Sequence, residues 1–329
     1  MSDIKKNKWH WRPVVPIVQN PLFSWPISLK QIFKWYISQW LSISIFTFCL
    51  FVAVVFWFFF QSPLEVYNNL NFKLMILIYV RNLGIVFLLA GGLHLYFYSF
   101  KKQKKDMKYD ARELSNSKIF TFNNQVLDNM FWTLLSGVTI WTAYEILLIW
   151  SYANGIVPSI NWVANPIWFC ILFFIIISWQ SLHFYFIHRI LHLPFLYKFV
   201  HHIHHRNINP GPWSGISMHP IEHLFYFSSI LIHFILPSHP LHVIFHFLAL
   251  SLGAMIVHCG FEGILINKKN KIPLGHFSHQ LHHRYFECNY GTLETPCDVF
   301  FDSFHDGTDE ADIKMREKHL NSHSISHDY

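Results

Sequence analysis

The sequence predicts an all-α integral membrane protein: a helical bundle of about four spans, a re-entrant or interfacial hairpin, and a histidine-rich cytosolic helical cap. Composition is the first observation behind this prediction. The 329 residues are 52% hydrophobic and 19% aromatic, with only 13% charged, which is typical of a chain solvated by lipid. The second observation is order along the chain, because the apolar residues form long blocks and most of the 24 histidines follow them, between positions 183 and 283.

Four apolar blocks predict the spans. They cover residues 41–60, 74–100, 130–150 and 162–182. Each reaches or exceeds the ~20 residues that a helix needs to cross a bilayer. The first block holds no charge, and the second and third carry only Arg81 and Glu145. An Asn-Gly pair and a proline between the last two blocks mark a tight turn, so these two spans should form a helical hairpin.

Basic residues flank the first two spans. Lys5, Lys6, Lys8 and Arg12 precede the first block, and Lys101, Lys102, Lys104, Lys105 and Lys108 follow the second. Because cytoplasmic flanks are enriched in lysine and arginine, both flanks are expected in the cytoplasm, and the second pair of spans returns the chain to that side at His183. The apolar segment from His223 to Glu262 is divided at Pro237–Pro240 into two pieces of marginal spanning length, which favours a re-entrant or interfacial hairpin.

These patterns divide the chain into four regions. They are a basic cytoplasmic segment at 1–40, a four-span region at 41–182, a histidine-rich region at 183–308 and a polar tail at 309–329. The net charge of +6 is concentrated beside the spans, where lipid headgroups explain it better than nucleic acid. We expect a multi-pass protein of the bacterial inner membrane or the endoplasmic reticulum, with its histidine clusters on the cytoplasmic side.

Three sets of histidines have the spacing of metal ligands. They are His188 and His192, then His201, His204 and His205, and finally His279, His282 and His283. Residues three or four apart share one face of a helix, so each set can direct its nitrogens at one point. Eight convergent imidazoles are twice what one tetrahedral zinc ion needs, so the sequence predicts two metal ions. His183 and His202 lie off these faces and are not expected to be ligands.

The ligand type limits the choice of metal. Imidazole suits iron, copper, nickel and zinc, whereas calcium and magnesium prefer oxygen ligands, which these segments lack. Two iron ions are favoured because a redox metal that activates dioxygen can attack unactivated hydrocarbon in a membrane. A membrane zinc-binding or metal-transport protein could use the same clusters, but it would need ionisable residues along its spans. A bis-histidine haem protein would need facing histidines inside the bundle, and only His94 is placed for that role.

Four motifs occur in order between Phe184 and Thr308. They are His188-Arg-Ile-Leu-His192, His201-His-Ile-His-His205, Met218-His-Pro-Ile-Glu222, and His279-Gln-Leu-His-His-Arg284 followed by Asn289-Tyr-Gly291 and Asp298. In this order and at this spacing they resemble the fatty acid hydroxylase/sterol desaturase superfamily, so region 183–308 is interpreted as a fatty acid hydroxylase-like catalytic region. The resemblance implies a membrane enzyme in which histidines hold two irons. Such an enzyme uses dioxygen and external electrons to hydroxylate or desaturate a lipid, whether fatty acyl, sterol or related.

The resemblance also implies roles for single residues. The eight histidines of the three sets would be the catalytic metal ligands, and His219 and His258 match positions where family members also carry histidine, so they are expected as further ligands. Candidates to support the ligands are Glu222, Glu262, Glu287 and Asp298. Ser181 stands where many relatives carry an acidic residue. No His-Pro-Gly-Gly segment of a fused cytochrome b5 is present, so electrons should come from a separate cytochrome b5-like protein, ferredoxin or reductase.

Overall fold

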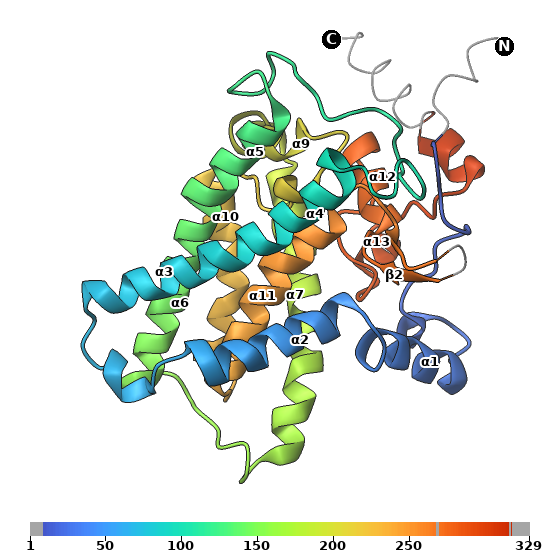
Figure 1. The fold of residues 1–329 in the computed structure, drawn as a ribbon. Helices are drawn as coiled ribbons and strands as arrows, with labels where there is room; N and C mark the ends of the chain where they lie inside the picture. Colours follow the sequence, from blue (N-terminus) through green and yellow to red (C-terminus); the bar gives the residue numbers. More distant parts are fainter. Residues whose placement is uncertain (1–8, 268–269, 316, 318–329) are drawn as a thin grey trace, which may run out of the picture.

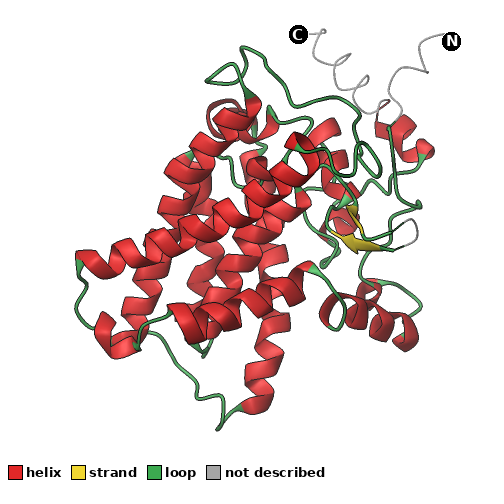
Figure 2. Ribbon diagram, in the orientation of Figure 1, coloured by secondary structure: helices red, strands yellow, loops and turns green. Residues whose placement is uncertain are grey.

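The computed structural model describes residues 9–267, 270–315 and 317. Within these residues the chain is a helical bundle with one small antiparallel sheet, formed by β1 (Gly263–Leu265) and β2 (Lys271–Pro273) (Figures 1 and 2). The predicted all-α membrane bundle is confirmed. The predicted basic residues Lys5, Lys6 and Lys8 and most of the predicted tail at 309–329 lie outside the described residues.

Within the described ranges, four helical stretches are long and apolar enough to cross a membrane. They are Phe72–Ser99 (α3, Phe72–Val86; η4, Phe87–Gly91; α4, Gly92–His94; η5, Leu95–Ser99), Gln125–Ala153 (α5, Gln125–Trp132; η6, Thr133–Gly137; α6, Val138–Ala153), Pro166–Leu191 (α7) and Pro240–Val257 (α11). The first three correspond to the predicted blocks at 74–100, 130–150 and 162–182. The third extends beyond its block, because α7 continues to Leu191 and so carries the first histidine set at its end.

The first predicted block, 41–60, differs from the prediction of one continuous span. The chain there forms α1 (Leu29–Trp40), then α2 (Ile45–Val55) and η2 (Phe56–Phe60), with a bend of 43° between the two parts. A capping box explains the break, since Thr47 N–H donates to Ser44 Oγ at 3.3 Å and Ser44 N–H donates to Thr47 Oγ1 at 2.9 Å. This motif starts a new helix at Ile45. Only the bent pair together is long enough to span.

The segment after His219 also differs from the predicted hairpin of two short pieces. Its first piece is short, with α10 at Pro220–Phe227 and η9 at Ser228–Phe234. The second piece, α11, is a full-length apolar helix, and 89% of its most apolar window is buried inside the protein. It packs against α2, α6 and α7, and Figure 1 shows α6, α7 and α11 running alongside one another. This helix is therefore the centre of the bundle.

The two charged side chains predicted inside the spans pair with each other. Arg81 of α3 forms an ion pair with Glu145 of α6, and Asn82 Nδ2 donates to Glu145 Oε2 at 2.9 Å and to Thr142 Oγ1 at 3.2 Å. Mutual pairing offsets part of the cost of holding charges away from water. Both charges therefore serve to join α3 and α6.

Short elements form the histidine-bearing end of the molecule. They are α8 (Pro194–Leu196), η7 (Tyr197–His201), α9 (His202–His205), η8 (Pro212–Ser214), α12 (Phe277–Tyr285) and α13 (Cys297–Phe300), while η1 (Pro21–Phe23) and η3 (Leu64–Tyr67) lie in the N-terminal part. Pro194 is the first residue of α8, where its missing N–H costs nothing. The chain therefore turns directly after α7 and brings the second histidine set back toward the first.

Candidate metal centre

Among the residues that the structure describes, nine histidines meet in two adjacent groups. The first group contains His188, His192, His201, His205 and His282, and the second contains His204, His258, His279 and His283. Within each group the candidate ligand nitrogens all lie within 4.8 Å of one another. The structure thus brings together all eight histidines of the three predicted sets, and each group draws on residues far apart in the sequence.

The two His-x-x-His-His motifs divide their side chains between the groups in opposite ways. In the motif that ends in α9, His201 and His205 join the first group and His204 joins the second. In α12, His279 and His283 join the second group and His282 joins the first. Residues four apart share a helical face, and the remaining histidine lies beside that face. Each motif therefore bridges the two groups.

The two further histidines that the resemblance implies as ligands lie in different places. His258 is the residue that ends α11, and its ring lies in the second group. His219 precedes α10, where its Nδ1 accepts a hydrogen bond from Ile221 N–H at 3.2 Å, and it belongs to neither group. The structure therefore places His258, but not His219, with the eight predicted ligands.

The nitrogens of the second group form a close triangle. The Nε2 atom of His258 lies 2.9 Å from Nε2 of His283 and 3.1 Å from Nε2 of His279, and the latter two are 3.2 Å apart. His258 Nδ1 donates to Ala254 O at 2.7 Å, so in the neutral ring Nε2 carries a lone pair. Imidazole nitrogens about 2.1 Å from one cation are about 3.0–3.4 Å apart. The triangle fits a shared cation.

The ring nitrogens of the first group also lie close together. Nε2 of His205 lies 3.0 Å from Nε2 of His192 and 3.1 Å from Nε2 of His282. The Nε2 atoms of His188 and His201 are buried without a hydrogen-bond partner among the described residues. Buried polar atoms normally have partners, so unpaired lone pairs directed at one point are the donor set expected of a metal site.

Partners on Nδ1 orient several of these rings. His188 Nδ1 donates to Tyr290 O and His282 Nδ1 donates to Cys288 O, each at 2.6 Å. His201 Nδ1 lies 2.8 Å from Glu222 Oε1. A proton held on Nδ1 leaves Nε2 free to bind a metal, and such partners fix the ring orientation.

The predicted supporting carboxylates have separate outcomes. Glu222 contacts a histidine directly. Asp298 accepts hydrogen bonds from Tyr290 N–H at 2.9 Å and Gly291 N–H at 2.8 Å, so it holds the loop whose Tyr290 carbonyl orients His188. Glu262 instead accepts from Tyr109 and Lys271, at 2.7 Å in both cases. Among the described residues, Glu287 belongs to neither group. Two of the four carboxylates therefore support the site.

Polar residues at the start of α5 hold α9 in place, which sequence reasoning missed. Asn207 Oδ1 accepts from Gln125 Nε2 at 3.0 Å and from Asn129 Nδ2 at 2.9 Å, while Asn207 Nδ2 donates to His204 O at 3.1 Å. Arg206 and Asp128 form an adjoining ion pair. The sequence pattern that could have predicted these contacts is the placement of three polar residues, Gln125, Asp128 and Asn129, on one face of an otherwise apolar helix.

Burial keeps these imidazoles neutral. It lowers the pKa of His192 to about 2 and that of His258 to about 4, and in the first case electrostatic interactions with His188 and Arg189 add to the effect of burial. The pKa values of six other ring groups lie well below the usual value, chiefly for the same reason: His201, His204, His205, His279, His282 and His283. Neutral imidazole is the form that binds metal ions.

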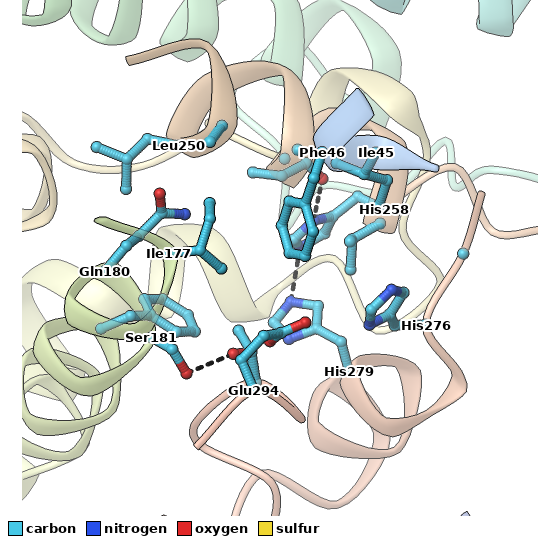
Figure 3. A pocket seen from close by; sticks show the side chains of 18 of the residues that line it. Ile45, Phe46, Ile177, Gln180, Ser181, Leu250, His258, His276, His279 and Glu294 are labelled. Atoms are coloured by element: carbon cyan, nitrogen blue, oxygen red, sulfur yellow. Dashed lines mark hydrogen bonds between the residues drawn. The ribbon is translucent and has the colours of Figure 1, made fainter. Parts of the chain in front are cut away.

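A cavity of about 400 Å³ adjoins the second group. His204, His258 and His279 form one wall, and residues of α1, α2, α7 and α11 form the others. Figure 3 shows Ile45, Phe46, Ile177 and Leu250 around this space. An apolar cavity that ends at a cluster of ligands can hold a lipid chain or ring system against a metal.

Fold and site together define a class: a helical membrane protein with a candidate two-metal histidine centre beside an apolar cavity. Residues 172–303 match the model of the fatty acid hydroxylase family. This match and the similarity to curated sterol desaturases support the fatty acid hydroxylase/sterol desaturase superfamily, as the motifs predicted.

Several curated fungal proteins are similar to this chain. A Delta(7)-sterol 5(6)-desaturase of Gibberella zeae, ERG3B, is 32% identical over 164 residues, which cover 46% of this chain and 49% of that protein. The Delta(7)-sterol 5(6)-desaturase erg3C of Aspergillus fumigatus is 29% identical over 160 residues, with 41% of this chain and 49% of the relative covered. The matches thus span about half the length of these relatives. No solved structure gives a significant match.

Proposed function

We propose that this protein is an integral membrane non-haem di-iron oxygenase that hydroxylates or desaturates a lipid. A sterol is the first substrate class to test, because the similar proteins are named as Delta(7)-sterol 5(6)-desaturases. Two iron ions, when bound, would supply the redox chemistry that lets dioxygen oxidise an unactivated C–H bond. The co-substrates would be dioxygen and electrons from a separate cytochrome b5-like protein, ferredoxin or reductase. The histidine groups would face the cytoplasm.

One observation carries the proposal: the second histidine group forms a wall of the apolar cavity. The ring nitrogens of His258, His279 and His283 lie within 3.2 Å of one another, and His204, His258 and His279 line the cavity. A lipid in that space would present its C–H bonds directly to the metals. Oxidation of hydrocarbon requires this contact, whereas storage of a metal does not.

The chain's own residues would perform three tasks. The neutral imidazoles of His188, His192, His201, His204, His205, His279, His282 and His283, with His258, would hold the two ions. Glu222 and the carbonyls of Cys288 and Tyr290 would keep the rings oriented through Nδ1. The apolar walls would exclude water, which protects a reactive oxidant from side reactions.

A membrane zinc-binding or metal-transport protein is not favoured. Such a protein needs ionisable residues that form a path through its spans, but Arg81 and Glu145 pair with each other between α3 and α6. The family match to fatty acid hydroxylases also supports the oxygenase.

Neighbouring histidines of one motif provide a matched test. His204 is buried in the second group, whereas His202 is exposed and belongs to neither group. Membranes containing the wild-type protein, His204→Ala or His202→Ala would be supplied with a Delta(7)-sterol, a fatty acid, dioxygen and a reductase system, and the lipids would be analysed by mass spectrometry. The iron content of each purified protein would be measured in parallel.

We expect the wild-type protein and His202→Ala to oxidise a lipid and to hold about two irons per chain. In His204→Ala, turnover should fall by about 100-fold or more, the upper range for loss of a residue that organises a metal site. No oxidised lipid with any of the three proteins, or equal activity of His204→Ala and His202→Ala, would overturn the proposal.

A further inference from the structure

The cavity has histidines at one end and uncharged side chains, including an amide, at the other. Figure 3 shows His258, His276 and His279 on one side and Gln180, Ile177 and Ser181 on the opposite side. Gln180, on α7, lines the same cavity as His204, His258 and His279. A bound molecule could therefore touch the histidine wall and the Gln180 wall at once.

Gln180 is a polar side chain of this wall that lacks a hydrogen-bond partner for one of its atoms in the described part of the chain. Its Oε1 atom is buried and has no hydrogen-bond partner among the described residues. The adjacent Ser181 is satisfied, because its Oγ lies 2.6 Å from Thr292 Oγ1 and 2.8 Å from Thr295 Oγ1. A buried amide oxygen without a partner is rare in folded proteins. The amide is thus available to a ligand in the cavity, whereas the Ser181 hydroxyl is already used by the protein.

The charge of the cavity limits what that ligand can be. Among the lining residues that the structure describes, Glu294 is the only one with a full charge, and neither lysine nor arginine is present. A carboxylate or phosphate headgroup would enter this space without a counter-charge, which is unfavourable in an apolar site. A neutral hydroxyl suits the amide, because it can both donate to Oε1 and accept from Nε2.

We propose that Gln180 is a positioning residue that binds the hydroxyl group of a neutral lipid alcohol, such as a sterol, at the end of the cavity opposite the histidines. The proposal rests on the proposed function of the site. The hydrogen bond fixes the distance between the hydroxyl and the histidine wall, so it selects which C–H bond faces the metals. Free fatty acids and phospholipids are disfavoured by the lack of cationic residues.

Equilibrium binding tests this inference separately from turnover. The wild-type protein and the near-isosteric variant Gln180→Met would be titrated in detergent with three probes: a Delta(7)-sterol, its 3-deoxy analogue and a long-chain fatty acid. Gln31→Met is the matched control, because Gln31 is exposed on α1 and does not line the cavity. For active preparations, the position of oxidation in the sterol would also be determined.

The wild-type protein and Gln31→Met should bind the sterol about tenfold more tightly than the 3-deoxy analogue, as expected for one hydrogen bond, and should bind the fatty acid more weakly than the sterol. In Gln180→Met the preference for the hydroxyl should shrink to about twofold or less, with a broader distribution of oxidation sites. Equal binding of sterol and 3-deoxy analogue by the wild-type protein, or an unchanged preference in Gln180→Met, would overturn the inference. If binding follows the expectation but no lipid is oxidised, only the proposed oxygenase function fails.

Discussion

Glu222 Oε1 lies 2.8 Å from Nδ1 of His201, and the two side chains are only 2% and 1% exposed. This contact joins α10 to the histidine motif that ends in α9. Burial raises the pKa of Glu222 well above its ordinary value, yet the geometry still gives the imidazole one defined partner. Because that partner occupies Nδ1, the Nε2 atom of His201 is left for a metal.

Replacing Glu222 should weaken metal binding. We expect Glu222→Ala to lower metal affinity by about 10- to 100-fold, because His201 loses the group that orients its ring. Glu222→Gln should lose less, since an amide oxygen can still accept from Nδ1. The measurement is the metal retained per chain during dialysis against a graded chelator series.

Glu262→Gln is the matched control for this experiment. Glu262 is also a carboxylate that the sequence suggested as support, but it contacts Tyr109 and Lys271. Its replacement should leave metal retention unchanged. If Glu262→Gln loses metal as readily as Glu222→Ala, the contact with His201 has no special role.

The histidines His258 and His219 should behave differently when replaced. His258→Ala removes one corner of the nitrogen triangle in the second group, so the variant should hold about one metal per chain under conditions where the wild-type protein holds about two. His219→Ala should keep both, because His219 lies in neither group. Metal analysis of the two purified variants checks this, and equal loss in both would contradict the division into groups.

The histidine sets could be predicted from sequence because their spacing is local. A His-x-x-His-His motif places its rings within one helical turn, whatever the rest of the fold. The pairing across motifs could not be predicted, since it depends on how α7, α9 and α12 meet. His258 illustrates this limit: it stands alone in the sequence after an apolar helix, and only the central position of α11 brings it to His279 and His283.

Two further kinds of feature could not be predicted from the sequence: the backbone carbonyls that orient histidine rings, and the positions of helix breaks. The carbonyls of Cys288 and Tyr290 orient two rings, but carbonyl groups occur at every position and carry no sequence signal. In the predicted block at 41–60, hydropathy alone suggested one span, whereas the capping box of Ser44 and Thr47 starts a new helix. A serine followed three residues later by a threonine is a weak local signal beside a long apolar run.

Acid should destabilise the metal-free protein. Burial lowers the pKa of His258 to about 4 and that of His192 to about 2 in the folded state, while an unfolded histidine titrates near about 6.5. Below about pH 6.5 the unfolded state therefore binds more protons, so stability is complete above this pH and is lost as the pH falls toward the folded-state values. Each such histidine should cost about 1 kcal/mol between about pH 7.5 and 5.5.

Thermal unfolding in detergent measures this effect. The midpoint for the metal-free protein should fall steadily from about pH 7.5 to 5.5, and the metal-loaded protein should resist until protons displace the ion. A midpoint that does not change with pH in the metal-free protein would contradict burial of neutral imidazoles.

Gly215 should be intolerant of any side chain, because the segment after η8 passes directly over α11. A Cβ atom at this position would lie 2.5 Å from the backbone carbon of Ala254 and 2.5 Å from the backbone nitrogen of Met255. Backbone atoms in the last turn of the packed helix α11 cannot move without disturbing its hydrogen bonds, so Gly215→Ala should destabilise the protein by about 1–3 kcal/mol. The displaced segment also lines the cavity, so lipid binding should weaken as the protein is destabilised.

Gly92→Ala is the matched control, since a Cβ there meets nothing within 4 Å and alanine favours a helix by about 0.5–1 kcal/mol relative to glycine. Unfolding midpoints that fall for Gly215→Ala and hold or rise for Gly92→Ala are the expected result, and equal midpoints would show that α11 and this segment are not in close contact.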